Sequence, residues 1–84
     1  MKKEFSSELE ALNYLNNNYS NLKVKNFDIQ YRVINSNFKK QKANSLYDYI
    51  KSIIDNYNSL AIDTFSIDLG ENKIFLFDNI IEIL

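Results

Sequence analysis

The residues with the most chemical potential lie near the C-terminal end of the chain. An acid-x-lysine triplet spans residues 71–73, and Asp63 and Asp68 precede it. Two carboxylates that hold Mg²⁺, beside a lysine near the attacked phosphate, are typical of metal-dependent nucleases. Asp63 and Asp68 have opposite parity on a strand, however, and Glu71 follows Gly70 in a turn. The pattern therefore favours a solvated hairpin tip over a hydrolytic site.

A second pair of carboxylates, Asp48 and Asp55, lies in a segment with helical periodicity. Their spacing places both on one helix face, where they could act together in acid catalysis. No general base accompanies them, since the chain contains no histidine and no cysteine. That inventory also excludes disulfides, thiol nucleophiles and zinc fingers. We therefore expect a protein that is not an enzyme and that holds no metal ion or cofactor.

The only cluster of basic and aromatic side chains lies around a polar segment at residues 35–44. Aromatic rings that stack on bases, beside cations that pair with phosphates, bind single-stranded nucleic acid in many proteins. The formal net charge of −1 gives no supporting field, so a flexible, solvated lysine loop is the main alternative. The nucleic-acid candidates are Phe38, Lys39, Lys40, Lys42 and Arg32.

Two segments show the capping pattern and the periodicity of helices. Ser7 precedes Glu10 by three residues, as in a capping box, and leucines follow at helical spacing. Ser45 precedes Asp48 in the same way, ahead of an isoleucine-rich stripe. We predict helices over about residues 8–17 and about residues 46–58.

Most of the other apolar residues alternate with polar ones, as in strands with one wet face. One strand is predicted over residues 27–34, with a bulge or short turn near residues 25–26, where the apolar parity changes. Residues 64–69 and 73–77 flank a turn and predict a β-hairpin. Residues 78–84 form either a further turn and strand or a short helix, and the isoleucines favour the strand.

These elements predict a single domain over residues 1–84, because a chain of this length rarely contains two cores. We expect an α+β fold in which two helices pack on one face of a small, mostly antiparallel sheet, in the order α-β-α-β-β-(β). No apolar run approaches the ~20 residues of a membrane span, and the N-terminus does not resemble a secretory signal. We expect a cytoplasmic protein without a membrane partner.

The C-terminal segment carries more large apolar side chains than an alternating strand needs. Residues 74–77 and 80–81 place apolar side chains on both faces of the sheet, although two helices can cover only one. Burial is worth roughly 25 cal/mol per Å² of apolar surface, so leaving these side chains wet would cost several kcal/mol. Either the first helix crosses to the second face, or the sheet curls over itself, or an interface covers them. The interface candidates are Phe75, Phe77, Ile74, Leu76, Ile80 and Ile81.

We therefore predict a small non-catalytic interaction protein that binds a partner protein, or itself as a homodimer, through the C-terminal hairpin region. Its size and composition are those of inhibitors, immunity-type proteins and accessory proteins of phages or mobile elements. Frequent lysine, asparagine and isoleucine are typical of an AT-rich genome, bacterial or phage. The alternative is single-stranded nucleic-acid binding through the lysine-rich loop at residues 38–42.

Overall fold

The first helix begins at the predicted serine cap. The computed structural model describes the whole chain, residues 1–84. In it, α1 (Glu8–Asn18) follows Ser7, whose hydroxyl accepts a hydrogen bond from the Glu10 backbone N–H at 3.1 Å. This bond satisfies a donor that the first turn of any helix leaves unpaired. In the leucine stripe of α1, Leu12 and Leu15 are fully buried and Leu9 is half-buried.

The second helix also begins at its predicted cap, but it ends earlier than predicted. The Ser45 hydroxyl accepts a hydrogen bond from the Asp48 backbone N–H at 3.1 Å, at the start of α2 (Leu46–Asp55). The Asn56 backbone N–H then shares its hydrogen bond between two carbonyls of the last turn, at 3.1 and 3.2 Å. The chain tightens there into the short 3₁₀ helix η1 (Tyr57–Ser59), which occupies the final residues of the predicted helix.

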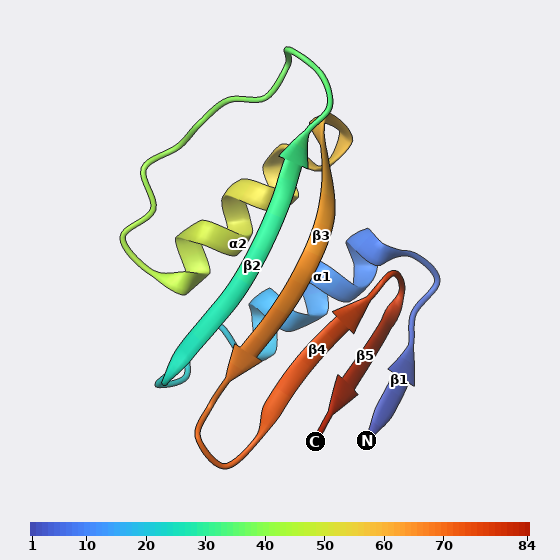
Figure 1. Cartoon of the computed structure of the whole chain (residues 1–84), viewed down its shortest axis with the longest axis vertical. Helices are drawn as coiled ribbons and strands as arrows, with labels where there is room; N and C mark the ends of the chain where they lie inside the picture. Colours follow the sequence, from blue (N-terminus) through green and yellow to red (C-terminus); the bar gives the residue numbers. More distant parts are fainter.

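The strands form one five-stranded sheet in the order β1-β5-β4-β3-β2, and every neighbouring pair is antiparallel (Figure 1). The predicted α+β class is therefore confirmed. The strands are β1 (Lys2–Glu4), β2 (Asn26–Val33), β3 (Leu60–Asp68), β4 (Lys73–Phe77) and β5 (Ile80–Ile83).

The sheet contains one strand that the sequence does not predict. β1 consists of three exposed residues, two lysines and a glutamate, and it pairs with β5. Nothing in its composition favours a strand, so only its hydrogen-bonding partner defines it. With β1, the order of elements is β-α-β-α-β-β-β, with η1 between α2 and β3.

The chain bends at Lys25, where the bulge or short turn is predicted, just before β2 begins at Asn26. The Lys25 backbone N–H donates to the Asp68 carbonyl at 2.8 Å, although Asn26 is the residue that pairs with Asp68.

β3 contains a further irregularity, which the sequence does not predict. Gln30 pairs with Thr64, but the next residue of β2 pairs with Ile62, so Asp63 is the extra residue. The bulge reverses which side chains of β3 face the helices. It allows apolar residues on both sides of Asp63 to reach the core.

The C-terminal segment is a strand, as the isoleucines favour, and not a short helix. Asp78 and Asn79 form the turn before β5, and Asp78 has a left-handed backbone with φ of 52°. The Asn79 side chain donates to the Phe5 carbonyl at 2.7 Å, and the Phe5 backbone N–H donates to the Asn79 carbonyl at 2.8 Å. These bonds hold the turn against the junction between β1 and α1.

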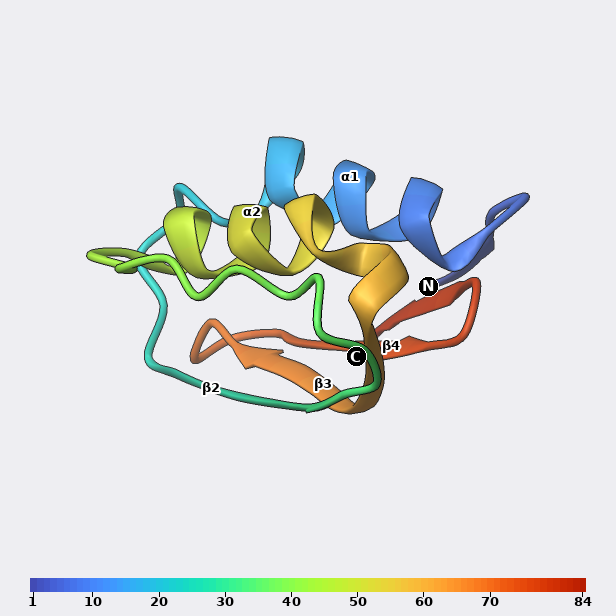
Figure 2. The ribbon, with the colours of Figure 1, turned by 90° about the horizontal axis from the view of Figure 1, so that it is seen from above.

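Both helices lie on the same face of the sheet, as Figure 2 shows from above. α1 does not cross to the second face, so that explanation for the apolar surplus is wrong. A single core fills the space between the two layers. Its fully buried large side chains are Leu12, Leu15, Ile50, Ile53, Ile67, Ile74 and Ile81.

Gly70 allows the turn of the predicted hairpin between β3 and β4. Its φ is +93°, a conformation that side chains with a Cβ rarely adopt, and its N–H donates to Asp68 Oδ1 at 2.8 Å. We expect Gly70→Ala to lower the free energy of unfolding by about 1 kcal/mol. A Cβ here would meet no atom within 4 Å, so backbone strain is the only source of the loss. Urea unfolding would measure it, and an unchanged midpoint would contradict it.

Candidate functional site

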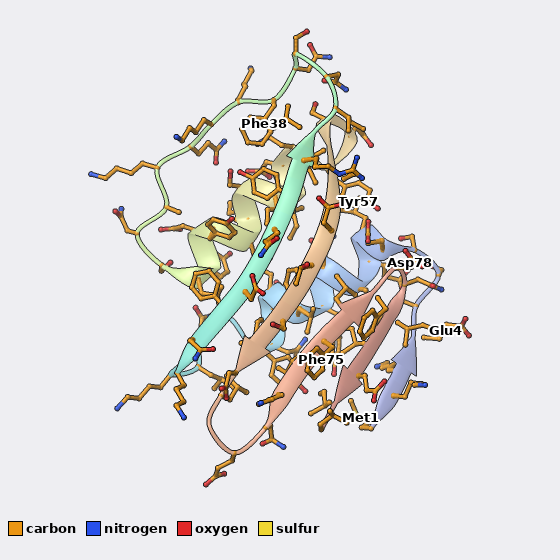
Figure 3. All side chains as sticks on the ribbon, in the orientation of Figure 1. Met1, Glu4, Phe38, Tyr57, Phe75 and Asp78 are labelled. Atoms are coloured by element: carbon orange, nitrogen blue, oxygen red, sulfur yellow. The ribbon has the colours of Figure 1, made fainter.

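The face of the sheet opposite the helices carries an uncovered aromatic pair. Phe75 and Phe77 lie two residues apart on β4 and point to this open face, since their neighbours Ile74 and Leu76 point into the core. The two rings are stacked, with centroids 6.2 Å apart and an interplanar angle of 16°. Phe77 is 61% exposed, whereas Phe75 is half-buried. Figure 3 views this face and labels Phe75.

Strand alternation divides the six interface candidates into two groups of three. Ile74, Leu76 and Ile81 are at most 5% exposed and belong to the core, so they cannot contact a partner in this fold. The interface prediction is wrong for these three residues. Phe75, Phe77 and Ile80 lie on the open face, where Phe77 pairs with Ile80 across β4 and β5. The open-face apolar cluster is therefore Phe75, Phe77 and Ile80.

One complete row of side chains crosses the open face at the level of Phe75. Because paired residues on neighbouring strands point to the same face, the register fixes this row. Lys2 and Glu82, at one end, approach to 3.9 Å. The row from β1 to β2 is Lys2, Glu82, Phe75, Ser66 and Asp28.

A groove of about 350 Å³ lies beside the aromatic pair. It opens because β3 and β4 pair only over three residues, from Ser66 opposite Phe75 to the hairpin turn. Phe75 and Phe77 line one side, and Asp28, Asp63 and Ser66 are among the residues that line the rest. The open face thus offers an apolar wall next to a polar, acidic one.

Charged side chains surround the open-face cluster, and carboxylates outnumber cations. Arg32 Nε donates to both carboxylate oxygens of Asp63, at 2.9 and 3.0 Å. This pair is exposed, so it contributes little to stability but fixes the orientation of both groups. By register, the charged residues of the face are the cations Lys2, Arg32 and Lys73 and the carboxylates Glu4, Asp28, Asp63, Asp68 and Glu82.

The nucleic-acid candidates are not brought together. Arg32 lies on the open face, where it forms an ion pair with Asp63. The loop that carries the lysines runs beside α2 instead (Figure 1). Phe38 is half-buried, with its ring 5.8 Å from that of Tyr31. Its ring is therefore not free to stack on a base. Lys39, Lys40 and Lys42 are exposed.

The carboxylates of the two sequence patterns have separate partners in the structure. Asp68 accepts the Gly70 N–H and pairs with Lys73 across the hairpin, while Asp63 faces Arg32. The structure holds no group of three or more carboxylates arranged to share a metal ion. Asp55 lies 3.8 Å from Lys51 on the exposed surface of α2. The acid-x-lysine triplet is thus part of a solvated hairpin.

Two tyrosines act as hydrogen-bond donors on the helical side. Burial, the hydrogen bond to Glu8 and the charges of Glu8 and Asp78 raise the pKa of Tyr57 to about 12. Its hydroxyl donates to Glu8 Oε1 at 2.7 Å and so ties η1 to α1. Burial and the neighbouring Tyr31 raise the pKa of Tyr49. Neither phenol is a base at neutral pH, because a raised pKa keeps its proton in place.

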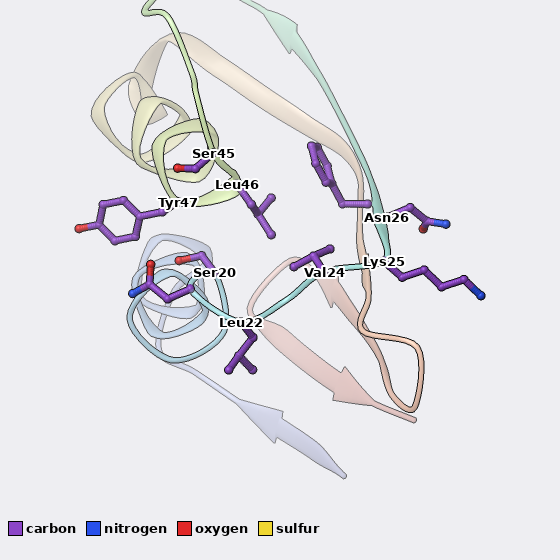
Figure 4. Close-up of a pocket in the computed structure, with 10 residues that line it drawn as sticks. Ser20, Leu22, Val24, Lys25, Asn26, Ser45, Leu46 and Tyr47 are labelled. Atoms are coloured by element: carbon purple, nitrogen blue, oxygen red, sulfur yellow. The ribbon is translucent and has the colours of Figure 1, made fainter.

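A larger hollow, of about 460 Å³, lies at one end of the molecule (Figure 4). Ser20, Leu22, Val24, Leu46 and Tyr47 are among its lining residues, between the end of α1, the start of α2 and the start of β2. Lys25 is its only charged side chain, and no carboxylate is present to act as a base.

Neither helix has the length and apolar content needed to cross a bilayer. The open-face cluster, its groove and its charged rim are the features best suited to recognition. Comparison with protein-family models, with curated proteins and with solved structures finds no match to this chain.

Proposed function

We propose that this protein binds another protein through the open face of its sheet, with Phe75, Phe77 and Ile80 at the centre of the interface. The observation that carries the proposal is the stacked phenylalanine pair on a face that no helix covers. Phenylalanine side chains bury 150–250 Å² each, so covering Phe77 alone contributes about 2 kcal/mol. Aromatic residues at the centre of a polar rim are typical of protein interfaces.

The charges on this face favour a different protein over a second copy. Five carboxylates and three cations lie on the face, so two copies placed face to face would repel each other, whereas a partner with a basic rim would be attracted. In the cytoplasm, such a domain would act as an inhibitor, an immunity-type protein or an accessory protein of a phage or mobile element. It would do so by covering a surface of its partner.

Affinity capture from the native host, followed by mass spectrometry, tests the proposal when three baits are compared. Phe77→Ser removes the exposed ring, and Leu22→Ser removes another exposed apolar side chain, 50% exposed and outside the open face. We expect the wild type and Leu22→Ser to capture the same protein and Phe77→Ser to lose it. Capture of identical proteins by all three baits would refute the assignment of the open face.

Light scattering at micromolar concentration distinguishes the two kinds of partner. We expect a monomer of 9.9 kDa for the wild type. A dimer that dissociates in Phe77→Ser would assign the same face to self-association instead.

A further inference from the structure

β2 presents a long free edge at the side of the sheet opposite to β1. It has eight residues, against three charged residues in β1 at the other edge. The Ile29 carbonyl lies on this edge, because it accepts the Tyr49 hydroxyl at 3.4 Å. By alternation, the backbone groups of Phe27, Tyr31 and Val33 also point away from β3. Apart from the Ile29 carbonyl, which accepts the Tyr49 hydroxyl, these groups form an unpaired ladder that another chain can extend.

Apolar side chains along this edge are exposed as well. Phe27 is 45% exposed, Val33 is 54% exposed, and Ile34, just beyond the strand, is 58% exposed. A hollow of about 260 Å³ lies between Phe27, Tyr49 and loop residues 43–45, so the loop leaves the Phe27 end of the edge open. Farther along the strand, Phe38 of the loop packs against Tyr31. β2 contains neither lysine nor proline, and its two charged side chains, Asp28 and Arg32, point to the open face.

The region around this edge is strongly basic. Residues 23–42 contain six of the ten cations of the chain and one of its eleven carboxylates, Asp28, which gives this segment a net charge of +5. The loop is held beside α2 by Asn56, whose Oδ1 accepts the Lys39 N–H at 2.7 Å and whose Nδ2 donates to the Lys39 carbonyl at 3.0 Å. A chain with a net charge of −1 therefore concentrates positive charge at one edge.

We propose that the free edge of β2 and the lysines of the adjacent loop bind an extended, carboxylate-rich segment of a partner protein, which joins the sheet as a further strand. The backbone ladder supplies the main hydrogen bonds of such a complex. Because the side chains of an added strand alternate between the two faces, those of its carboxylates that point to the helix side face Lys39, Lys40 and Lys42 beside α2.

Two other ligands fit this edge less well. A nucleic acid offers no backbone ladder of alternating N–H and C=O groups, and the rings of Phe38 and Tyr31 are packed together. A second copy joined by two-fold symmetry would bring both α2 helices over one seam, because α2 runs alongside β2 (Figures 1 and 2). A single extended segment brings no second helix to this seam.

A labelled peptide of about ten residues, the length of a long strand, with alternating valine and glutamate is a direct probe. We expect micromolar binding in fluorescence anisotropy, and binding weakened about tenfold in the triple variant Lys39→Gln, Lys40→Gln, Lys42→Gln. The matched control Lys2→Gln, Lys51→Gln, Lys73→Gln removes the same charge elsewhere and should change the affinity less than about twofold. No binding of the wild type at millimolar peptide would overturn the proposal.

Backbone methylation of the peptide tests strand addition itself. Methyl groups on the valine nitrogens and on the glutamate nitrogens block opposite edges of the peptide, so only one of the two methylated peptides should lose binding. Equal binding of the two methylated peptides would mean that charge attraction alone holds the peptide, and it would overturn strand addition. A decathymidine that bound more tightly than the peptide, with the same lysine dependence, would assign the site to nucleic acid instead.

The NMR amide shifts caused by the peptide locate the binding site. We expect them along Asn26–Val33 and in the lysine loop, and not on the open face around Phe77. Shifts confined to the open face would overturn the edge proposal while leaving the proposed function intact. Peptide-independent dimerisation through β2, seen by light scattering, would assign the edge to a second copy.

Discussion

Replacing Ile74 with alanine is expected to lower the free energy of unfolding by about 3 kcal/mol. The side chain is fully buried, and it pairs with Ile67 of β3 on one side and Ile83 of β5 on the other. Truncation leaves a cavity between the sheet and the helices that the surrounding layers cannot close. Since small domains have a total stability of roughly 5–15 kcal/mol, the variant should unfold at much lower urea concentration.

Phe77→Ala is the matched control on the same strand. Phe77 is larger than Ile74 and lies three residues away, but it is 61% exposed. Its truncation should change the free energy of unfolding by less than about 0.5 kcal/mol, as is usual for surface sites. A larger loss for Phe77→Ala than for Ile74→Ala would mean that β4 presents the opposite face to the helices. Such a result would remove the basis of the proposed interface.

Asn56→Ala is expected to lower the free energy of unfolding by about 2 kcal/mol. The Asn56 side chain is nearly buried, and besides its two bonds to Lys39 it donates to the Ser52 carbonyl at 2.9 Å. Its loss leaves partly buried backbone groups without partners and frees the lysine loop from α2. Hydrogen exchange at the Lys39 amide should accelerate at the same time, because its acceptor is removed.

Asn58→Ala provides the comparison two residues away. Asn58 is exposed and its side chain makes no hydrogen bond, so this variant should unfold at the wild-type urea concentration. Equal losses in the two variants would indicate that helix propensity, and not the bridge to Lys39, sets the effect. Unchanged exchange at Lys39 in Asn56→Ala would contradict the anchoring role of Asn56.

The two proposed surfaces differ in position and in charge. The open-face cluster lies on β4 and β5 within an acid-rich face, whereas the free edge of β2 lies beside a basic loop. A variant at Phe77 should therefore leave peptide binding at the edge unchanged, and a variant of the loop lysines should leave capture through the open face unchanged. Each proposal can fail without the other.

Several elements were predictable because their signals are local. A serine cap followed by an apolar stripe defines a helix start within one turn, and both helices begin where Ser7 and Ser45 predict. Gly70 and the residues around it define the turn of the hairpin, since few other residues adopt its backbone angles. Alternating residues in β2 and β3 predicted strands for the same reason.

Other features depend on contacts between distant segments. β1 is a strand only because Lys3 pairs with Ile81, and its own residues carry no strand signal. The bulge at Asp63 was not predicted, because only the pairing of β3 with β2 shows that Asp63 is an extra residue. The end of α2 was predicted too late because the bonds of Asn56 lead to a loop that is distant in the sequence.

The amino-acid sequence by itself determined the α+β class, the helix starts, the hairpin and the excess of apolar residues near the C-terminus. Propensity, capping and turn chemistry act over a few residues, so they are visible along the chain. Only the tertiary structure decided that Ile74, Leu76 and Ile81 are core while Phe75, Phe77 and Ile80 remain on the open face. That division depends on both helices packing on one side of the sheet, and packing of whole layers is a property of the assembled fold.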